Sequence, residues 1–285
     1  MVKKHISKIQ SRKEDTHKGD FGHVFVVGGS KGMSGAAYLT SQAALISGSG
    51  LVTCGIPESL NAIMEVKLTE CMTLPLPETS HACIASAAEK NILEFSAKSD
   101  VIAVGPGMSR YSETLRLIRS IVTRIDKPLV LDADGIIALE KHIEILGKRK
   151  EGTVITPHPG EMSRITGKDI KWIQENREKV ASDVAKKYTA VVVLKGHRTV
   201  VADSSGDIYV NQTGNSGMST AGVGDVLTGI IASFIGQKID LYSASVIGVY
   251  LHGLAGDIAS REKGQFGMIA SDLLSFLPKA IIETL

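Results

Sequence analysis

Short apolar runs alternate along most of the chain with longer segments in which apolar residues recur at helical spacing. The short runs are rich in Val, Ile and Leu and are apolar throughout, which is typical of strands buried on both faces of a parallel sheet. Six such strands are predicted, at 24–29, 51–56, 100–105, 128–133, 153–157 and 190–196. Amphipathic helices are predicted between them, at 34–47, 112–125, 134–146 and 172–188. The alternation predicts an α/β fold with a central, mostly parallel sheet and helices on both faces.

The pattern changes after residue 196. Residues 199–212 predict a hairpin that turns at Ser205-Gly206-Asp207, and three helices follow at 224–236, 241–261 and 269–283. The sequence contains no linker rich in Pro, Gly or Ser, no short repeat and no low-complexity tract. We therefore expect residues 1–285 to form one domain, with 1–16 as a basic N-terminal extension.

Composition excludes several classes of protein. Of the 285 residues, 43% are hydrophobic and 22% are charged, and the formal net charge is +2, which predicts partners that are neither nucleic acid nor membrane. The start of the chain lacks the apolar run of a signal peptide, and no apolar segment approaches the roughly 20 residues that span a bilayer. Three cysteines without a CxxC motif favour reduced thiols and a cytoplasmic protein.

Glycine-rich or polar sequences follow most of the predicted strands, where a doubly wound sheet gathers its functional groups. The first is Gly28-Gly29-Ser30-Lys31-Gly32-Met33-Ser34-Gly35, which contains neither the GxGxxG fingerprint nor a Walker A motif. It is either a plain turn from strand to helix or a loop against which a ligand lies. In the second case Ala36 opens the helix, because a larger side chain there would intrude on the ligand.

Three further strand ends carry candidate residues with two interpretations each. Gly105-Pro106-Gly107 either stops a strand or forms a flat surface for a ligand. Asp132 and Asp134 either bind metal or phosphate, or occupy a strand end and the cap of a helix beginning at Gly135. His158 lacks a second ligand at zinc spacing, so it is either an ordinary solvated loop residue or a contact for a ligand, with Glu161 as a first-turn acid.

The segment Lys195-Gly196-His197-Arg198-Thr199 follows the last predicted buried strand. Its cationic side chains and its glycine suit the phosphate or ribose of a nucleotide. A charged hairpin turn is the alternative interpretation.

The most specific segment runs from Gly214 into the helix that begins near Asp225. A helix N-terminus attracts anions, and glycines at 222 and 224 let several N–H groups turn toward one phosphate. Asp225 would then lie beside the phosphoryl group and accept a proton from an attacking hydroxyl. A plain N-cap needs only the aspartate, without the glycines or Asn215, so a functional role is favoured.

Six motifs occur in one order over nearly the whole chain from about His17. They are HKGDFGHVFVVGGSKGMSGAA (17–37), VGPGMS (104–109), LDADG (131–135), TPHPGE (156–161), LKGHRT (194–199) and GNSGMSTAGVGDVLTGIIA (214–232). Together they resemble the ADP-dependent (S)-NAD(P)H-hydrate dehydratases, which belong to the ribokinase-like superfamily. The resemblance implies a ribokinase-like fold.

The resemblance also assigns roles to residues of this sequence. Asp225 is the implied catalytic residue. The implied contacts of the hydrated nicotinamide substrate are Ala36, Gly107, His158 and Asp225. The implied contacts of the adenine nucleotide are Lys195, Gly196, His197, Arg198, Thr199, Asn215, Ser216, Gly217, Met218, Ser219, Thr220, Ala221, Gly222, Val223 and Gly224. The chain departs from the family at Ser219, often Ala, and at Val223, commonly a small hydroxyl residue, which leaves less polar help near the phosphate.

The implied reaction is dehydration of the S epimer of NADHX or NADPHX to NADH or NADPH, with ADP as co-substrate, Mg²⁺ as cofactor, and AMP and phosphate as products. A separate NAD(P)H-hydrate epimerase is the expected pathway partner, because only a short basic segment precedes His17. Relatives commonly form tetramers, so a homo-oligomer is expected. The main alternative is an ATP-dependent kinase of the same superfamily that phosphorylates a vitamin precursor or sugar. A silent adenylate sensor and a redox dehydrogenase fit less well, given Asp225 and the missing dinucleotide fingerprint.

Overall fold

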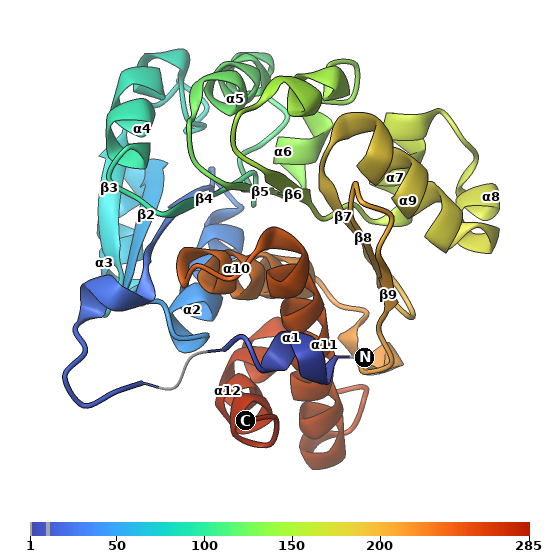
Figure 1. The fold of residues 1–285 in the computed structure, drawn as a ribbon. Helices are drawn as coiled ribbons and strands as arrows, with labels where there is room; N and C mark the ends of the chain where they lie inside the picture. The colour runs from blue at the N-terminus through green and yellow to red at the C-terminus, as the bar shows by residue number, and fades with distance from the viewer. Residues whose placement is uncertain (1, 10–11) are drawn as a thin grey trace.

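The computed structural model describes residues 2–9 and 12–285. Within them the strands form one sheet in the order β3-β2-β1-β4-β5-β6-β7-β8-β9 (Figure 1). The sheet is parallel from β3 to β7, and β7, β8 and β9 pair antiparallel. The strands are β1 His23–Val27, β2 Leu51–Pro57, β3 Met72–Leu76, β4 Val101–Val104, β5 Leu129–Leu131, β6 Thr153–Ile155, β7 Val191–Leu194, β8 Val200–Ala202 and β9 Ile208–Val210.

Helices cover both faces of the sheet, as Figure 1 shows. One layer contains α4 (Glu89–Ser96), α5 (Ser112–Arg124), α6 (Asp134–Ile137), α7 (Pro159–Thr166), α8 (Ile170–Glu175) and α9 (Arg177–Tyr188). The other contains α2 (Ser34–Ile46), α10 (Val223–Gly236), α11 (Leu241–Lys263) and α12 (Ala270–Ile282). Shorter pieces are α1 (Lys3–Ile6), α3 (Asn61–Lys67) and 3₁₀ helices at Lys18–Phe21, Glu58–Leu60, Ser86–Ala88, Ile143–Lys148 and Ser216–Met218.

Alternate residues of the central strands face the two helical layers. Val24 and Val26 of β1 belong to the core that includes α2 and α10, whereas Phe25 and Val27 belong to the opposite core. All four side chains are fully buried. Burial on both faces explains the uninterrupted apolar runs and confirms the predicted α/β architecture.

Some predicted elements were wrong in extent. The helix expected at 134–146 ends at Ile137, and a 3₁₀ helix at Ile143–Lys148 then buries Ile143 and Leu146 in the core, because apolar spacing alone does not distinguish one helix from two shorter pieces. The segment at 172–188 divides into α8 and α9 near Asn176. Strand β3 escaped prediction because it lies at the sheet edge and contains Pro75, which reduces its resemblance to a strand.

The basic N-terminal segment packs on the fold. The Nδ1 atom of His5 lies 2.9 Å from the Ser243 hydroxyl of α11, and Lys8 forms a 2.6 Å ion pair with Asp240. The interpretation of residues 1–285 as a single domain stays a prediction. In the described part of the chain, no helix combines the length and hydropathy needed to cross a bilayer.

The order of the strands places a crevice at one point of the sheet. From β1 the chain moves to β2 and β3 on one side, then returns to β4 on the other side of β1. The loops that follow β1 and β4 therefore diverge at the carboxyl edge, where ligands of open α/β sheets bind. These loops are 28–33 and 105–111.

Candidate active site

The N-terminus of α10 presents unpaired backbone donors. Gly222 is its N-cap residue at φ +88°, a left-handed conformation that favours glycine, and no side chain caps the helix. The first bond at this end runs from the Val226 N–H to the Gly222 carbonyl, so the N–H groups of Val223, Gly224 and Asp225 have no partner within the helix. Asp225 lies in the first turn and is not the cap. Its position suits a group beside a bound anion.

The environment of Asp225 raises its pKa to about 7. Burial is the main cause, and the nearby carboxylates of Asp132 and Asp134 add to it, while Lys195 opposes the shift. A carboxyl group with a pKa near neutrality accepts and releases protons readily at physiological pH. Asp225 is therefore suited to proton transfer rather than to structural capping.

A buried ion pair lies beside this helix end. The Nζ atom of Lys195, which follows β7, is 2.5 Å from Oδ1 of Asp132, which follows β5, and Thr156 donates to the same oxygen at 2.7 Å. Burial lowers the pKa of Lys195, but the charges of Asp132 and Glu161 outweigh burial and raise it. A Cβ atom at Gly224 would lie 3.4 Å from Nζ. Lys195 thus holds a positive charge against the start of α10.

Asp134 corrects one expectation from the sequence. Of its two interpretations, that of a cap for α6 is wrong, because the N-cap residue there is Ala133 and no side chain caps the helix. Oδ2 of Asp134 instead accepts a 2.8 Å hydrogen bond from the Ser109 N–H, and Oδ1 lies 3.7 Å from Nε of Arg110. This hydrogen bond links the start of α6 to the loop after β4, because α6 begins at the end of the strand next to β4.

His158 and Glu161 cap α7 together. Nδ1 of His158 accepts the Gly160 N–H at 2.9 Å, and Glu161 accepts the His158 N–H at 2.8 Å. Burial raises the pKa of Glu161 to about 7, helped by Asp132 and opposed by Lys195. Glu161 is thus part of the charge network around Lys195 as well as a first-turn acid.

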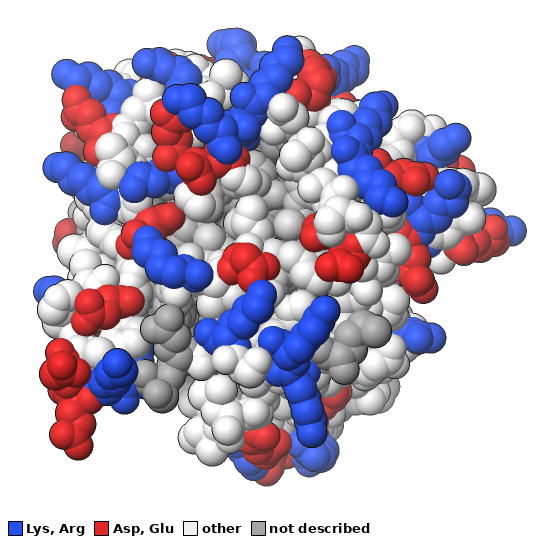
Figure 2. All heavy atoms as spheres, viewed as in Figure 1, with Lys and Arg blue, Asp and Glu red and all other residues white. Residues whose placement is uncertain are grey.

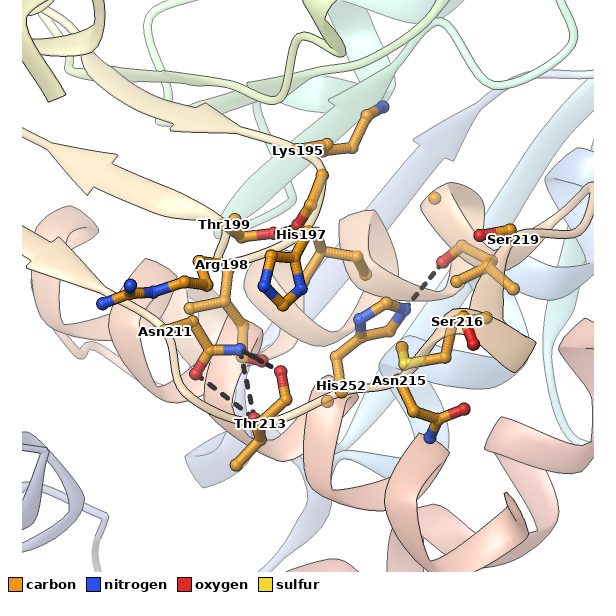
Figure 3. A pocket seen from close by; sticks show the side chains of 18 of the residues that line it. Lys195, His197, Arg198, Thr199, Asn211, Thr213, Asn215, Ser216, Ser219 and His252 are labelled. Carbon is orange, nitrogen blue, oxygen red and sulfur yellow. Dashed lines mark hydrogen bonds between the residues drawn. The ribbon is translucent and has the colours of Figure 1, made fainter. Parts of the chain in front are cut away.

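A pocket of about 710 Å³ opens beside these groups. Its walls come from the loop after β7, the loop before α10 and one side of α11 (Figure 3). The residues assigned to the nucleotide that line it are Lys195, Gly196, His197, Arg198, Thr199, Asn215, Ser216, Met218, Ser219, Thr220, Ala221, Val223 and Gly224. His158 also lines it. The structure therefore brings two separate sequence motifs to one cavity.

Three residues that the sequence assigned to the nucleotide also make structural contacts within the protein. The Asn215 amide donates to the Gly256 carbonyl and to Asp257, both at 2.9 Å, and its oxygen accepts the Gly217 N–H. A Cβ at Gly217 would lie 2.9 Å from the backbone of Gln265, and one at Gly222 would lie 2.5 Å from the side chain of Leu39. Gly217 and Gly222 are absent from the pocket wall, and the Asn215 side chain ties its loop to α11.

Sequence reasoning missed the part of the pocket contributed by α11 and by the residue after β9. His252 of α11 lies 2.9 Å from the Val223 carbonyl, and burial lowers its pKa to about 4, so its ring is neutral. Asn211 donates to the Val249 carbonyl at 2.9 Å, and Asp257 accepts the Gly214 N–H at 2.9 Å. The apolar pattern of α11 gave no signal for these contacts, because it is the pattern of an ordinary core helix.

The remaining substrate candidates, Ala36 and Gly107, lie at the crevice between β1 and β4. Gly107 is buried with φ +66°, and a Cβ there would lie 2.6 Å from the Met33 carbonyl oxygen and 3.0 Å from Cβ of Ala36. Neither residue lines the large pocket. Asp134 connects the two regions, because it contacts the loop after β4 and influences Asp225.

The described residues on the face of the molecule drawn in Figure 2 form no large cluster of like charges that would indicate a second binding site. Figure 2 shows basic and acidic side chains interspersed over it. This distribution agrees with the near-balanced composition.

Comparison with known proteins gives consistent matches. The family model described as NAD(P)H-hydrate dehydratase matches residues 24–279. The bifunctional NAD(P)H-hydrate repair enzyme Nnr of Moorella thermoacetica is 46% identical over 95% of this chain and 51% of its own length, so the chain spans about half of such relatives. The ADP-dependent (S)-NAD(P)H-hydrate dehydratase of Neisseria meningitidis serogroup B is 35% identical over 93% of this chain and 86% of its own length.

Solved structures agree with the sequence matches. The ADP/ATP-dependent NAD(P)H-hydrate dehydratase of Bacillus subtilis, co-crystallised with ATP/Mg²⁺, has a TM-score of 0.84 and 28% identity, covering 100% of this chain and 98% of that one. A ribokinase-like superfamily protein of Enterococcus faecalis has a TM-score of 0.82 at 24% identity, covering 100% and 95%. The second similarity confirms the ribokinase-like fold.

Proposed function

Because the chain belongs to the NAD(P)H-hydrate dehydratase family, we propose that it dehydrates the S epimer of NADHX and NADPHX to NADH and NADPH. In the same reaction ADP becomes AMP and phosphate. The observation that carries this proposal is Asp225, whose pKa is about 7, in the first turn of α10 beside Lys195 and the large pocket.

The proposed reaction has two steps, phosphoryl transfer to the substrate hydroxyl and then elimination of phosphate. In the first step, the hydroxyl oxygen of the substrate attacks the terminal phosphorus of ADP. Asp225 accepts the proton of this hydroxyl, and AMP leaves. The free N–H groups at the start of α10 and the ammonium of Lys195 stabilise the negative charge on the phosphoryl oxygens. The ring nitrogen then expels phosphate, which is a better leaving group than hydroxide. Loss of a proton from the neighbouring ring carbon restores the reduced nicotinamide.

Mg²⁺ fits this site as a companion of the nucleotide. Among the described residues, no group of three or more His, Cys, Asp or Glu side chains is arranged to hold a metal alone. Mg²⁺ is commonly bound through substrate phosphates, one or two carboxylates and water, and there it neutralises phosphate charge. The nucleotide phosphates and water would supply most of the ligands of such an ion, which leaves the Asp225 carboxylate free to accept the proton of the substrate hydroxyl.

The pH dependence of turnover follows from Asp225. Proton acceptance needs its ionised form, and its pKa is about 7. We expect kcat to rise as the pH increases from about 6 to 8, roughly tenfold per unit below about pH 7 and levelling above it. Turnover measured at saturating substrates across this range checks the prediction, and a flat profile would contradict a role for Asp225 in a rate-limiting proton transfer.

One assay tests the proposed function. Purified protein is mixed with hydrated NADH or NADPH, Mg²⁺ and either ADP or ATP, and recovery of the reduced-nicotinamide absorbance is followed with AMP formation in parallel. Recovery matched by AMP release from ADP supports the proposal. Accumulation of a stable phosphate ester on a small alcohol, without nicotinamide recovery, would identify a kinase instead.

Other expectations stay predictions. We expect an NAD(P)H-hydrate epimerase activity to supply the S epimer, and we expect the protein to work in the cytoplasm. A homo-oligomer, with a tetramer as the expected form, is supported by exposed apolar side chains near the C-terminal helix, where Ile269 is 55% and Ile282 77% exposed. Light scattering at working concentration decides the assembly.

A further inference from the structure

A second hollow, of about 470 Å³, lies outside the nucleotide pocket. It occupies the crevice where the chain order reverses between β1 and β4, because its walls come from the loops after these two strands and from the loop after β3. The residues that line it are Ser30, Lys31, Met33, His81, Cys83, Ser109, Arg110 and Tyr111. A topological switch point of an open α/β sheet is a favoured place for a ligand.

The charged side chains in this hollow are basic. Lys31 is exposed, and the Arg110 side chain is 63% exposed with its Nε atom 3.7 Å from Asp134. The rings of His81 and Tyr111 lie 4.9 Å apart in an edge-on arrangement. Two cations with an aromatic pair suit a ligand that carries phosphate groups and a planar base.

Hydrogen bonds join the hollow to the predicted substrate contacts. Ser30 donates from its hydroxyl to the Gly107 carbonyl at 2.8 Å, and the Lys31 N–H donates to the Ala82 carbonyl at 3.1 Å. The Ser109 N–H donates to Asp134, whose charge raises the pKa of Asp225. The order of sites is therefore the nucleotide pocket, the carboxylate cluster around Asp225, and then the hollow.

We propose that this hollow binds the adenosine half of the dinucleotide substrate, with Lys31 and Arg110 contacting its phosphates. The inference rests on the proposed function, which places ADP in the large pocket and the hydrated ring at Asp225. The adenosine half of the substrate, with the phosphate groups that it carries, then needs a place beyond the ring, and the mononucleotide lacks those phosphate groups. An anionic extension matches the basic side chains there, and the Tyr111 ring offers an apolar face to adenine.

Binding of NADPH, the proposed product, tests the hollow without requiring turnover. NADPH and reduced nicotinamide mononucleotide, which lacks the adenosine half, are titrated by nicotinamide fluorescence into wild type, Lys31→Gln, Arg110→Gln and the double variant. We expect NADPH to bind at least about tenfold more weakly in the double variant, since each lost charge-assisted contact weakens binding severalfold. Affinity for the mononucleotide and for ADP should stay within about twofold, because neither reaches the two cations. Lys98→Gln and Arg116→Gln are matched controls, because both residues are exposed and neither lines the nucleotide pocket or the hollow.

The outcomes separate this inference from the proposed function. Unchanged NADPH affinity in the double variant would overturn the proposal that the hollow binds the adenosine half, even if wild type dehydrates the hydrate as proposed. Equal weakening of NADPH and the mononucleotide also overturns it, because the effect would not depend on the adenosine half. Weakened ADP binding would show that the hollow holds the co-substrate instead, which again overturns it. Absence of dehydration in wild type rejects the proposed function, whereas the NADPH titration still reports on the hollow.

Discussion

Asp225→Asn is expected to lower kcat by about 10²–10⁴-fold, the usual contribution of a positioned general base. Asparagine keeps the size of the side chain but cannot accept the proton of the attacking hydroxyl. Asp225 is not among the residues that line the nucleotide pocket, so the Kd for ADP should change by less than about threefold. Single-turnover kinetics and calorimetric titration of ADP measure the two quantities. Turnover near the wild-type value would remove Asp225 from the catalytic role.

The same substitution should stabilise the protein at alkaline pH. The folded-state pKa of Asp225 is about 7, above the value of about 4 for an unfolded aspartate, so the folded protein binds this proton more tightly. Stability due to this group is therefore present below about pH 4 and is lost as the pH rises to about 7. An asparagine at this position does not titrate, so the variant would escape that loss.

The thermal stability has a clear pH signature. At about pH 8 we expect Asp225→Asn to melt a few degrees above wild type, for a gain on the order of 1–3 kcal/mol, and the gap should narrow toward about pH 5. Asp126→Asn is the control, because the Asp126 side chain is 70% exposed. A variant that melts below wild type at alkaline pH would show that Asp225 does not carry a burial penalty.

Lys195→Met is expected to produce the largest loss of stability among the site residues. Methionine fills a similar volume but leaves Asp132, whose side chain is 2% exposed, without its ionic partner. Removing one partner of a buried pair destabilises a protein by about 3–5 kcal/mol, and the 18% exposure of Lys195 places this case near the lower end. The midpoint of thermal unfolding should fall by about 5 °C.

A second variant separates stability from ligand binding. Lys195→Met with Asp132→Asn removes both charges and keeps an oxygen that accepts the Thr156 hydroxyl, so most of the stability should return. Affinity for ADP should stay at least about tenfold below wild type in both variants, because the cation beside the phosphates is missing. Lys150→Met is the control, since that lysine is 81% exposed in its ion pair with Asp126, and we expect at most about 1 kcal/mol. If the double variant is as unstable as the single one, the buried charge of Asp132 is not the cause.

The sequence by itself determined the architecture and the motif set. Uninterrupted apolar runs such as 190–194 could only be buried on both faces, and this physical requirement led to a parallel sheet between helical layers. The glycine-rich segment before α10 likewise predicted an anion site, because a helix N-terminus has unpaired donors wherever it lies. Edge strand β3 and the division of 134–146 were not predictable, since local apolar spacing does not record what an element packs against.

Only the tertiary structure decided which side chains act on one another. Lys195 and Asp132 are 63 positions apart, and their 2.5 Å contact exists because β5 and β7 end at the same edge of the sheet. The pKa of Asp225 depends on burial and on charges from other strand ends, so an aspartate in the sequence says nothing of whether it titrates near neutrality. Asn215 belongs to the predicted nucleotide motif, yet folding turns its amide toward α11. The sequence supplied the chemical groups, and long-range packing set their distances, their burial and therefore their chemistry.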